Sequence, residues 1–269
     1  LGFKTQELEE SWKKYTGLKN AHFLNSNTSG LHLALKILKD ANKWNDGDEI
    51  ITSPLTFVSS NHAIMYENLK PVFADVDADT QNISVATVSA KITANTKAIL
   101  AVHLAGWSCD MDGLMALAEQ HGCSVIEDCA QAHGASINGK SAGTFGDLSC
   151  FSFYPTKNLG ALGDAGAVTT NDTDLAQAVR SLRNYGTTSK YINEWPGFNS
   201  RLDEIQASFL LQKLTLLDQD NARRRAIAQR YLKEIKSDKI FLQEQRCTTD
   251  HVYHLFVVRV ANRPEFEAY

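Results

Sequence analysis

The sequence predicts an α/β fold with a mostly parallel central sheet that helices cover on both faces. Short apolar runs alternate with longer helical patterns through most of the chain. Such alternation is typical of βαβ units, whose strands are buried between helices. With 269 residues, 43% of them hydrophobic and 22% charged, the chain can bury the core that this fold needs.

Leu8 and Trp12, four residues apart among charges, predict an opening amphipathic helix at 5–14. The predicted elements then follow as a strand at 21–24, a helix from 31, a strand at 49–52, a helix at 58–67, a strand at 71–76, a helix at 85–92, a strand at 98–102, a helix at 111–121 and a strand at 123–128. In sheets built this way, function gathers at the carboxyl ends of the strands.

The second half of the chain is expected to complete this domain and begin another. Its predicted elements are a strand at 148–153, a strand at 165–171, a helix at 172–183 capped by Asp172 or Thr173, a long loop at 184–200, a helical pattern at 202–236 broken near 218–221, and a strand at 254–260. We therefore expect a large domain at 1–236 and the start of a small C-terminal α/β domain at 237–269. The missing initiator Met and the abrupt end suggest that both ends are cut.

Composition excludes several classes of function. The net charge of −4 and the pI near 6.1 provide no broad basic field, so nucleic acid and anionic membranes are not expected partners. No apolar run approaches the ~20 residues that span a bilayer, and no signal peptide is visible. Five widely spaced cysteines without a Cys-x-x-Cys pair are typical of reduced thiols in the cytoplasm. His251 and His254 form a lone His-x-x-His, which is too weak a pattern to predict a metal site.

Three polar features fall at predicted strand ends. The turn at 26–30 opens a helix, where backbone N–H groups and hydroxyls suit a phosphate; a simple capping turn is the alternative. Asp128 ends a buried strand and needs a cationic partner, which is either a protein side chain or a ring nitrogen of a ligand. Lys157 follows the next strand, so both side chains are expected to face one crevice.

These three features together match the requirements of pyridoxal phosphate. A lysine in a crevice has a lowered pKa and becomes an amine nucleophile toward an aldehyde. The cofactor needs a phosphate holder, a carboxylate for its pyridinium nitrogen and an amine for its aldehyde. The glycines at 160–166 have the wrong spacing for a Rossmann Gly-x-Gly-x-x-Gly, and a Walker A pattern is absent.

The chain also resembles the fold-type I, pyridoxal-phosphate-dependent sugar aminotransferases of the DegT/DnrJ/EryC1/StrS family. The resemblance extends from about Thr5 to Arg259. Four segments carry it in order: Asn25 to Leu35, Glu127-Asp128-Cys129-Ala130-Gln131-Ala132-His133-Gly134, Ser152 to Gly160, and Gly197 to Ala207. It implies the aspartate aminotransferase-like fold, with a mostly parallel sheet in the large domain.

The resemblance implies a role for each matching residue. Lys157 would bind the aldehyde of pyridoxal 5′-phosphate, and Asp128 would pair with its pyridinium nitrogen. Thr28 and Ser29 match the phosphate turn, and Ser152 would add a hydroxyl to the phosphate.

Three further residues match positions around the cofactor ring and at the subunit boundary of the family's site. Phe57 matches the aromatic residue that stacks on the cofactor ring, with core packing as the alternative, and Gln131 matches a residue near the phenolic oxygen. Asn199 matches an asparagine that reaches the phosphate of a neighbouring subunit, which implies a homodimer. His103 and His133 align near the site, and they receive no firm role.

The implied reaction moves an amino group from glutamate to a nucleotide-linked keto sugar, with Lys157 as both tether and general acid/base. The segments at 154–166 and 199–204 are most similar to enzymes that aminate C3 of dTDP-3-oxo-6-deoxyhexoses; C4-aminating relatives share the framework. Two other readings remain, a sugar dehydratase of the same fold and a non-catalytic regulator. The dehydratases carry histidine where this chain has Lys157.

Overall fold

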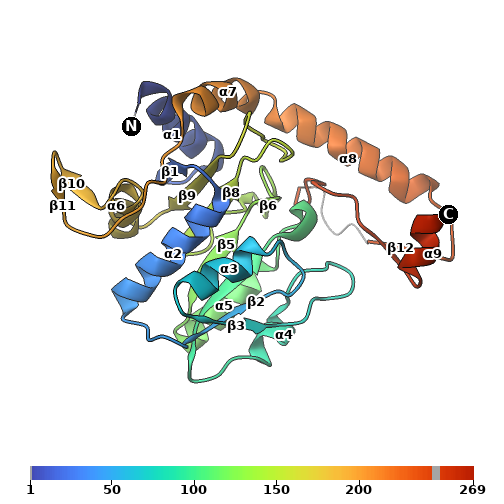
Figure 1. Cartoon of the computed structure of the whole chain (residues 1–269). Helices are drawn as coiled ribbons and strands as arrows, with labels where there is room; N and C mark the ends of the chain where they lie inside the picture. Colours follow the sequence, from blue (N-terminus) through green and yellow to red (C-terminus); the bar gives the residue numbers. More distant parts are fainter. Residues whose placement is uncertain (1, 244–248) are drawn as a thin grey trace.

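The computed structural model describes residues 2–243 and 249–269, and Figure 1 shows the chain coloured along its sequence. A seven-stranded sheet forms its centre, in the order β1-β9-β8-β5-β4-β2-β3. The strands are β1 Asn20–Leu24, β2 Glu49–Thr52, β3 Lys70–Phe73, β4 Thr96–Val102, β5 Ser124–Asp128, β8 Leu148–Ser152 and β9 Gly166–Thr170. The strands from β3 to β8 run parallel, whereas β9 and β1 are antiparallel to their neighbours. The expected mostly parallel sheet is confirmed.

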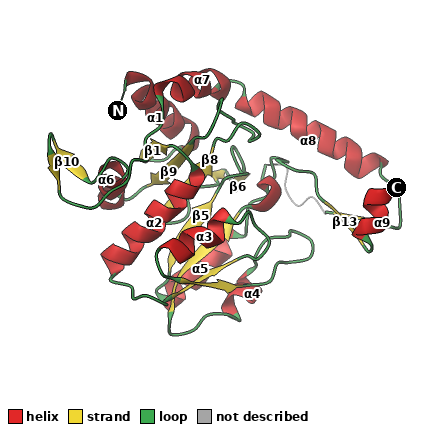
Figure 2. Cartoon of the chain, in the orientation of Figure 1, coloured by secondary structure: helices red, strands yellow, loops and turns green. Residues whose placement is uncertain are grey.

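Helices cover both faces of the sheet, as Figure 2 shows. Side chains alternate between faces along a strand, so Ile50 packs with one set of helices and Ile51 with the other. The first set is α2 Asn27–Asn42, α3 Ser59–Tyr66 and α6 Thr173–Leu182. The second set is α1 Phe3–Thr16, α4 Val85–Ser89, α5 Met111–His121 and α7 Glu204–Leu214. Because both faces are buried, the central strands direct apolar side chains toward both sets of helices, for example Ile126 toward the first and Val125 toward the second.

Some element boundaries differ from the sequence-based expectation. Asp172 caps α6 as predicted, by accepting from the backbone N–H of Leu175 at 2.9 Å. The predicted break near 218–221 is wrong, because α8 Leu217–Glu234 already covers these residues and the chain turns between α7 and α8 instead. The expected loop at 184–200 contains a short hairpin, β10 Thr187–Ser189 and β11 Ile192–Asn193.

The C-terminal part lies at the far end of α8, away from the sheet (Figure 1). It contains β12 Ile240–Leu242, β13 Val258–Val260 and α9 Arg263–Ala268. The strand expected at 254–260 is wrong before Val258, because residues 250–255 instead bond to a turn of 3₁₀-helix, η1 Leu104–Gly106, and its neighbours. The remaining small hairpin is β6 Ser136–Ile137 with β7 Lys140–Ser141. The division into domains at 236 and 237 stays a prediction.

Two sequence-based expectations concern the cellular environment. Cys109, Cys123, Cys129 and Cys150 are free thiols, and Cys247 lies outside the described residues. Within residues 2–243 and 249–269, no helix combines the length and the apolar character required to cross a membrane.

Candidate active site

Lys157 lies on a tight turn that follows β8. Its backbone N–H donates to the carbonyl of Tyr154 at 2.8 Å. The turn requires Gly160, because a Cβ at that position would lie 2.4 Å from the carbonyl oxygen of Pro155. Burial lowers the pKa of the Lys157 amine, and the nearby charge of Asp128 opposes that shift. The turn therefore presents an amine that loses its proton more easily than a solvated lysine does.

Asp128 ends β5, the strand that pairs with β8, and its side chain is only 4% exposed. Its Oδ1 accepts from the Asn27 side chain at 3.1 Å and from the Ala130 backbone at 3.1 Å, while Ser60 Oγ donates to Oδ2 at 2.8 Å. All three donors are neutral. Of the ion pairs found in the described part of the chain, none includes Asp128. A buried carboxylate whose hydrogen-bond donors are all neutral favours a positively charged ligand.

The N-terminus of α2 lies against the start of β9. Ser26 caps the helix, and its Oγ accepts from the backbone N–H of Ser29 at 3.1 Å. Other N–H groups of a first helical turn have no acceptor inside the helix, so they are available to an anion. A Cβ on Gly166 would lie 2.3 Å from the Ser26 carbonyl carbon, so only glycine permits this approach. The turn is thus a cap, and it also has the donors of an anion site.

A cavity of about 510 Å³ joins these features. The predicted site residues that line it are Thr28, Phe57, Asp128, Gln131, Ser152 and Lys157. The ring of Phe57 is 73% exposed, so the alternative of core packing is wrong for it. Ser152 Oγ accepts from the backbone N–H of Tyr154 at 3.3 Å, which leaves its hydroxyl proton free to donate.

Two predicted residues occupy less direct positions. Gln131 lines the cavity, but its Oε1 accepts from the backbone N–H of Ala105 at 2.6 Å. Ala105 has φ 57, so the Gln131 amide stabilises a left-handed turn at the cavity edge. Asn199 is exposed and outside the cavity, where its Oδ1 accepts from Arg201 Nε at 3.2 Å. Its role toward a neighbouring subunit stays a prediction.

The two histidines near the site are held by protein contacts. His103 Nδ1 accepts from the Cys109 backbone at 3.1 Å, so the ring proton lies on Nε2, 3.0 Å from Glu127. Cys129 completes a buried group with His103 and Glu127 whose ligand atoms lie within 4.8 Å of one another. His133 packs among aromatic rings, and burial together with the charge of Lys157 lowers its pKa to about 3.

The structure adds residues that sequence patterns did not single out. Asn27 and Ser60 orient Asp128, and the cavity wall also includes Thr56, Ser59, Tyr154, Thr156 and Asp164. Asn27 stands inside the polar turn at 26–30, so its position carried a signal. The sequence gives no such signal for Ser60, because a serine in the first turn of a helix is common.

Lysine, unpaired carboxylate and helix N-terminus, set around one cavity of an α/β sheet, place the chain in the class of pyridoxal-phosphate enzymes. Comparison with known families gives the finer assignment. The model of the DegT/DnrJ/EryC1/StrS aminotransferase family matches residues 1–268, so the chain belongs to this family.

Curated relatives match nearly the whole chain or all of it. It is 47% identical over 269 residues to a dTDP-3-amino-3,6-dideoxy-alpha-D-galactopyranose transaminase of Aneurinibacillus thermoaerophilus, covering 100% of this chain and 73% of the relative. It is 42% identical to a UDP-N-acetyl-3-dehydro-alpha-D-glucosamine 3-aminotransferase of Acidithiobacillus ferrooxidans, covering 98% of this chain and 70% of that one.

Solved structures share the fold closely. DesV of S. venezuelae in complex with a ketimine intermediate superposes with a TM-score of 0.94 at 41% identity, covering 100% of this chain and 71% of DesV. NtdA of Bacillus subtilis with bound cofactor PMP superposes with a TM-score of 0.88 at 31% identity, covering 100% and 60%. The expectations of fold class and of an aminotransferase family are confirmed.

Proposed function

We propose that the protein is a pyridoxal-phosphate-dependent aminotransferase that transfers an amino group from glutamate to C3 of a dTDP-linked 3-oxo-6-deoxyhexose. One observation carries the chemistry: Asp128 is a buried carboxylate with only neutral donors, and it shares a cavity with Lys157, an amine of lowered pKa. That combination suits a cationic ring and an aldehyde, and one cofactor supplies both.

The cavity offers partners for the charged groups of this cofactor. The α2 N-terminus, approached closely by Gly166, provides backbone and hydroxyl donors for a phosphate, with Thr28 and Ser152 of the cavity lining as holding residues. Ser29 lies outside the cavity lining, and its Oγ accepts from Ser26 Oγ at 3.0 Å, so its role at the phosphate stays a prediction. When bound, pyridoxal phosphate supplies an aldehyde for amines and a protonated ring that withdraws electrons from the reacting carbon.

The chain's own residues then orient groups and move protons. Asp128 keeps a proton on the ring nitrogen, and Asn27 and Ser60 hold its carboxylate in place. With the cofactor bound, Lys157 Nζ would take the proton from the α-carbon of the amino donor and return it during the transfer. Burial suits this task, because an amine of lowered pKa gives up its proton more easily than a solvated lysine does.

The choice of sugar is supported by the names of the relatives. The Aneurinibacillus relative acts on a dTDP-linked 3-amino-3,6-dideoxy sugar, and the Acidithiobacillus relative aminates C3 of a UDP-linked sugar. C3 amination is therefore proposed over C4 amination, dehydration or a purely regulatory role.

A homodimer in the cytoplasm completes the proposal. The exposed ring of Phe57 and the position of Asn199 outside its own cavity support a site completed by a second copy. The free thiols at Cys109, Cys123, Cys129 and Cys150 suit a reducing compartment.

The cofactor is tested by absorbance. Protein reconstituted with pyridoxal phosphate should be yellow, glutamate should bleach the colour, and Lys157→Ala should not form the band. Colourless wild-type protein after reconstitution would refute the cofactor assignment.

The substrate is tested by transfer of the amino group from glutamate to a panel of dTDP-, UDP- and GDP-linked 3-keto and 4-keto sugars. We expect the highest kcat/KM on the dTDP-3-oxo-6-deoxyhexose. Turnover of 4-keto sugars alone would contradict C3 amination.

A further inference from the structure

Asn158, the residue after Lys157, points into the protein and joins segments that are far apart in sequence. Its side chain is buried, with the residue only 5% exposed. Its Nδ2 donates to Asn221 Oδ1 on α8 at 2.8 Å and to the Val252 carbonyl at 3.1 Å. Its Oδ1 lies 3.1 Å from His254 Nδ1. The turn that presents Lys157 to the cavity is thus tied to the segment that returns from the C-terminal part.

The direction of these hydrogen bonds settles which atom of His254 carries the proton. Asn221 Nδ2 donates to the His133 carbonyl at 2.8 Å, so the other end of that amide, Oδ1, must accept. It accepts from Asn158 Nδ2, whose second proton goes to a carbonyl. Asn158 Oδ1 is an acceptor, so His254 must donate to it from Nδ1. Neutral His254 therefore has its lone pair on Nε2.

Burial and nearby charges keep the His254 ring neutral. Burial, together with the charges of Lys157 and Arg224, lowers its pKa to about 4. Arg224 reaches the neighbouring Tyr253 carbonyl at 3.4 Å. Near neutral pH, His254 thus offers an unprotonated Nε2 beside the lysine turn.

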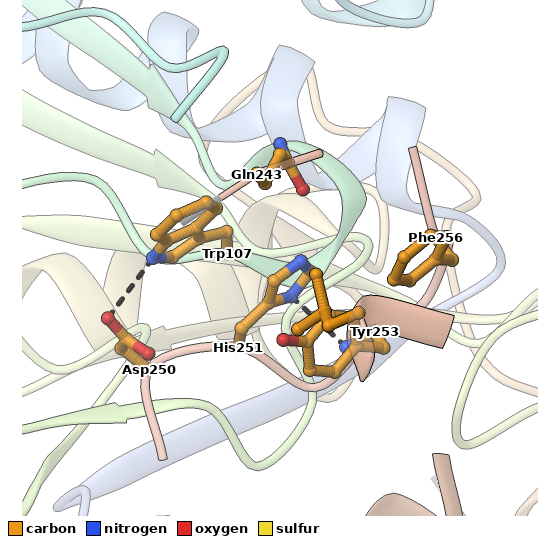
Figure 3. A pocket seen from close by; sticks show the side chains of 7 residues that line it. Trp107, Gln243, Asp250, His251, Tyr253 and Phe256 are labelled. Atoms are coloured by element: carbon orange, nitrogen blue, oxygen red, sulfur yellow. Dashed lines mark hydrogen bonds between the residues drawn. The ribbon is translucent and has the colours of Figure 1, made fainter. Parts of the chain in front are cut away.

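The backbone that leads to His254 is anchored to the segment at 106–108. Ser108 donates to the Asp250 carbonyl at 2.9 Å, and Val252 donates to the Gly106 carbonyl at 2.9 Å. Figure 3 shows the neighbouring cluster, in which Trp107 Nε1 donates to Asp250 Oδ2 at 3.1 Å.

His251, in the same cluster, stacks on Trp107 with ring centroids 5.2 Å apart, and its Nδ1 accepts from the Tyr253 backbone at 3.1 Å (Figure 3). The two histidines of the His-x-x-His thus have opposite tautomers, each fixed by its own Nδ1 partner. Their Nδ1 atoms serve the protein's own hydrogen bonds.

We propose that Asn158 is a positioning residue that ties the Lys157 turn to the returning C-terminal segment and holds His254 in its neutral Nδ1–H form. The benefit to the reaction rests on the proposed function: Lys157 must lose and regain a proton, and a His254 ring held neutral adds no positive charge to its surroundings. Asn158 acts through His254 and through the lysine turn, without itself touching the reacting atoms.

The tautomer is measured by nitrogen NMR of the full chain with ¹⁵N-labelled histidine, where loss of signals in His254→Gln assigns the ring. We expect a protonated Nδ1 and a bare Nε2 for His254 at pH 7. In Asn158→Ala, the acceptor is gone and Nδ1–H should cease to be the main form. The control Asn42→Ala removes a single bond to the Leu38 carbonyl and should leave His254 unchanged.

Asn158→Asp separates the two halves of the proposal. It keeps an acceptor for His254 but removes both donated hydrogen bonds, so Nδ1–H should persist while the pKa of His254 rises by about one unit or more. A wild-type ring protonated on Nε2, or an Nδ1–H form unchanged in Asn158→Ala, would overturn the proposal. If Asn158→Ala does not fold, the wild-type and Asn158→Asp spectra still decide it.

Kinetics link the tautomer to catalysis. We expect kcat to fall about ten- to a hundredfold in Asn158→Ala, with a smaller change in KM for glutamate. In a His254→Gln background, Asn158→Ala should cause little further loss of kcat, because both changes act through one ring. Full additivity would contradict the link. An enzyme inactive on every keto sugar would refute the proposed function and leave the NMR result standing.

Discussion

Glu127 and Asp128 are consecutive carboxylates on β5, and their surroundings differ completely. Both are buried, at 0% and 4% exposure. Because strand side chains alternate, the two point to opposite faces of the sheet. Glu127 accepts five hydrogen bonds, from His103 Nε2, Ser149 Oγ and the backbone N–H groups of Gly143, Phe145 and Gly146. Asp128 accepts three and also borders the cavity.

The comparison shows how the surroundings of a buried carboxylate decide whether it can still bind a ligand. Burial alone would raise the pKa of Glu127, but the hydrogen bonds from His103, Gly143 and Gly146 outweigh it and lower the pKa. A carboxylate saturated by protein donors has no capacity left for a ligand. Asp128 keeps an open side toward a cavity, which is the position from which a ligand can be recognised.

The largest expected effect is on activity at Asp128. Asparagine can still accept from Asn27 and Ala130, and the Ser60 hydroxyl can rotate to accept instead of donating. We therefore expect Asp128→Asn to fold with nearly unchanged stability while kcat falls about 10²–10³-fold. Steady-state kinetics and urea unfolding measure the two quantities. A variant that kept its kcat would contradict a role for Asp128 in the reaction that Glu127 lacks.

At Glu127, the corresponding change should affect stability more than chemistry. A glutamine NH₂ would face the Gly143 N–H and the His103 Nε2–H, and His103 cannot reverse because Cys109 donates to its Nδ1. We expect Glu127→Gln to lower the free energy of unfolding by about 2–4 kcal/mol.

Urea unfolding gives this value, with the exposed Glu119→Gln as the control. Unchanged stability would contradict the view that the hydrogen bonds accepted by Glu127 stabilise the fold.

Acid titration sharpens the same contrast. The folded pKa of Glu127 lies below its ordinary value of 4.5, so its contribution to stability is complete above that value. The contribution is lost as pH falls below 4.5 toward the folded pKa. Wild type should therefore lose stability in this range more steeply than Glu127→Gln, measured by unfolding at a series of pH values. Parallel curves would count against an ionised Glu127.

The smallest effect is expected at Ser60, which donates one of the three hydrogen bonds to Asp128. Ser60→Ala leaves Asn27 and Ala130 in place, so the carboxylate stays oriented but less firmly. We expect kcat to fall about tenfold or less, in line with the loss of ~1 kcal/mol for one hydrogen bond. Ser89→Ala, at an exposed position of α4 outside the cavity, serves as the control.

The sequence predicted the elements of the large domain and the ends where function gathers. Asp128 closes an apolar run, and Lys157 follows the next one, so local patterns were enough to place both. The predicted element boundaries were wrong where the hydrogen-bond partners of a segment lie far away in the sequence. Residues 254–257 were expected to belong to a strand, but hydrogen bonds between residues 250–255 and η1 with its neighbours hold that segment instead. No local pattern records such a contact.

What the sequence by itself determined is the chemistry available at the cavity, namely a lysine, an acid and a helix start with hydroxyls. Only the tertiary structure decided how each group is used. Asp128 meets neutral donors from α2 and α3, 101 and 68 residues away, and Asn158 meets partners 63 and 94 residues away. Charge and tautomer depend on these neighbours, because desolvation and hydrogen bonding act across space and not along the chain.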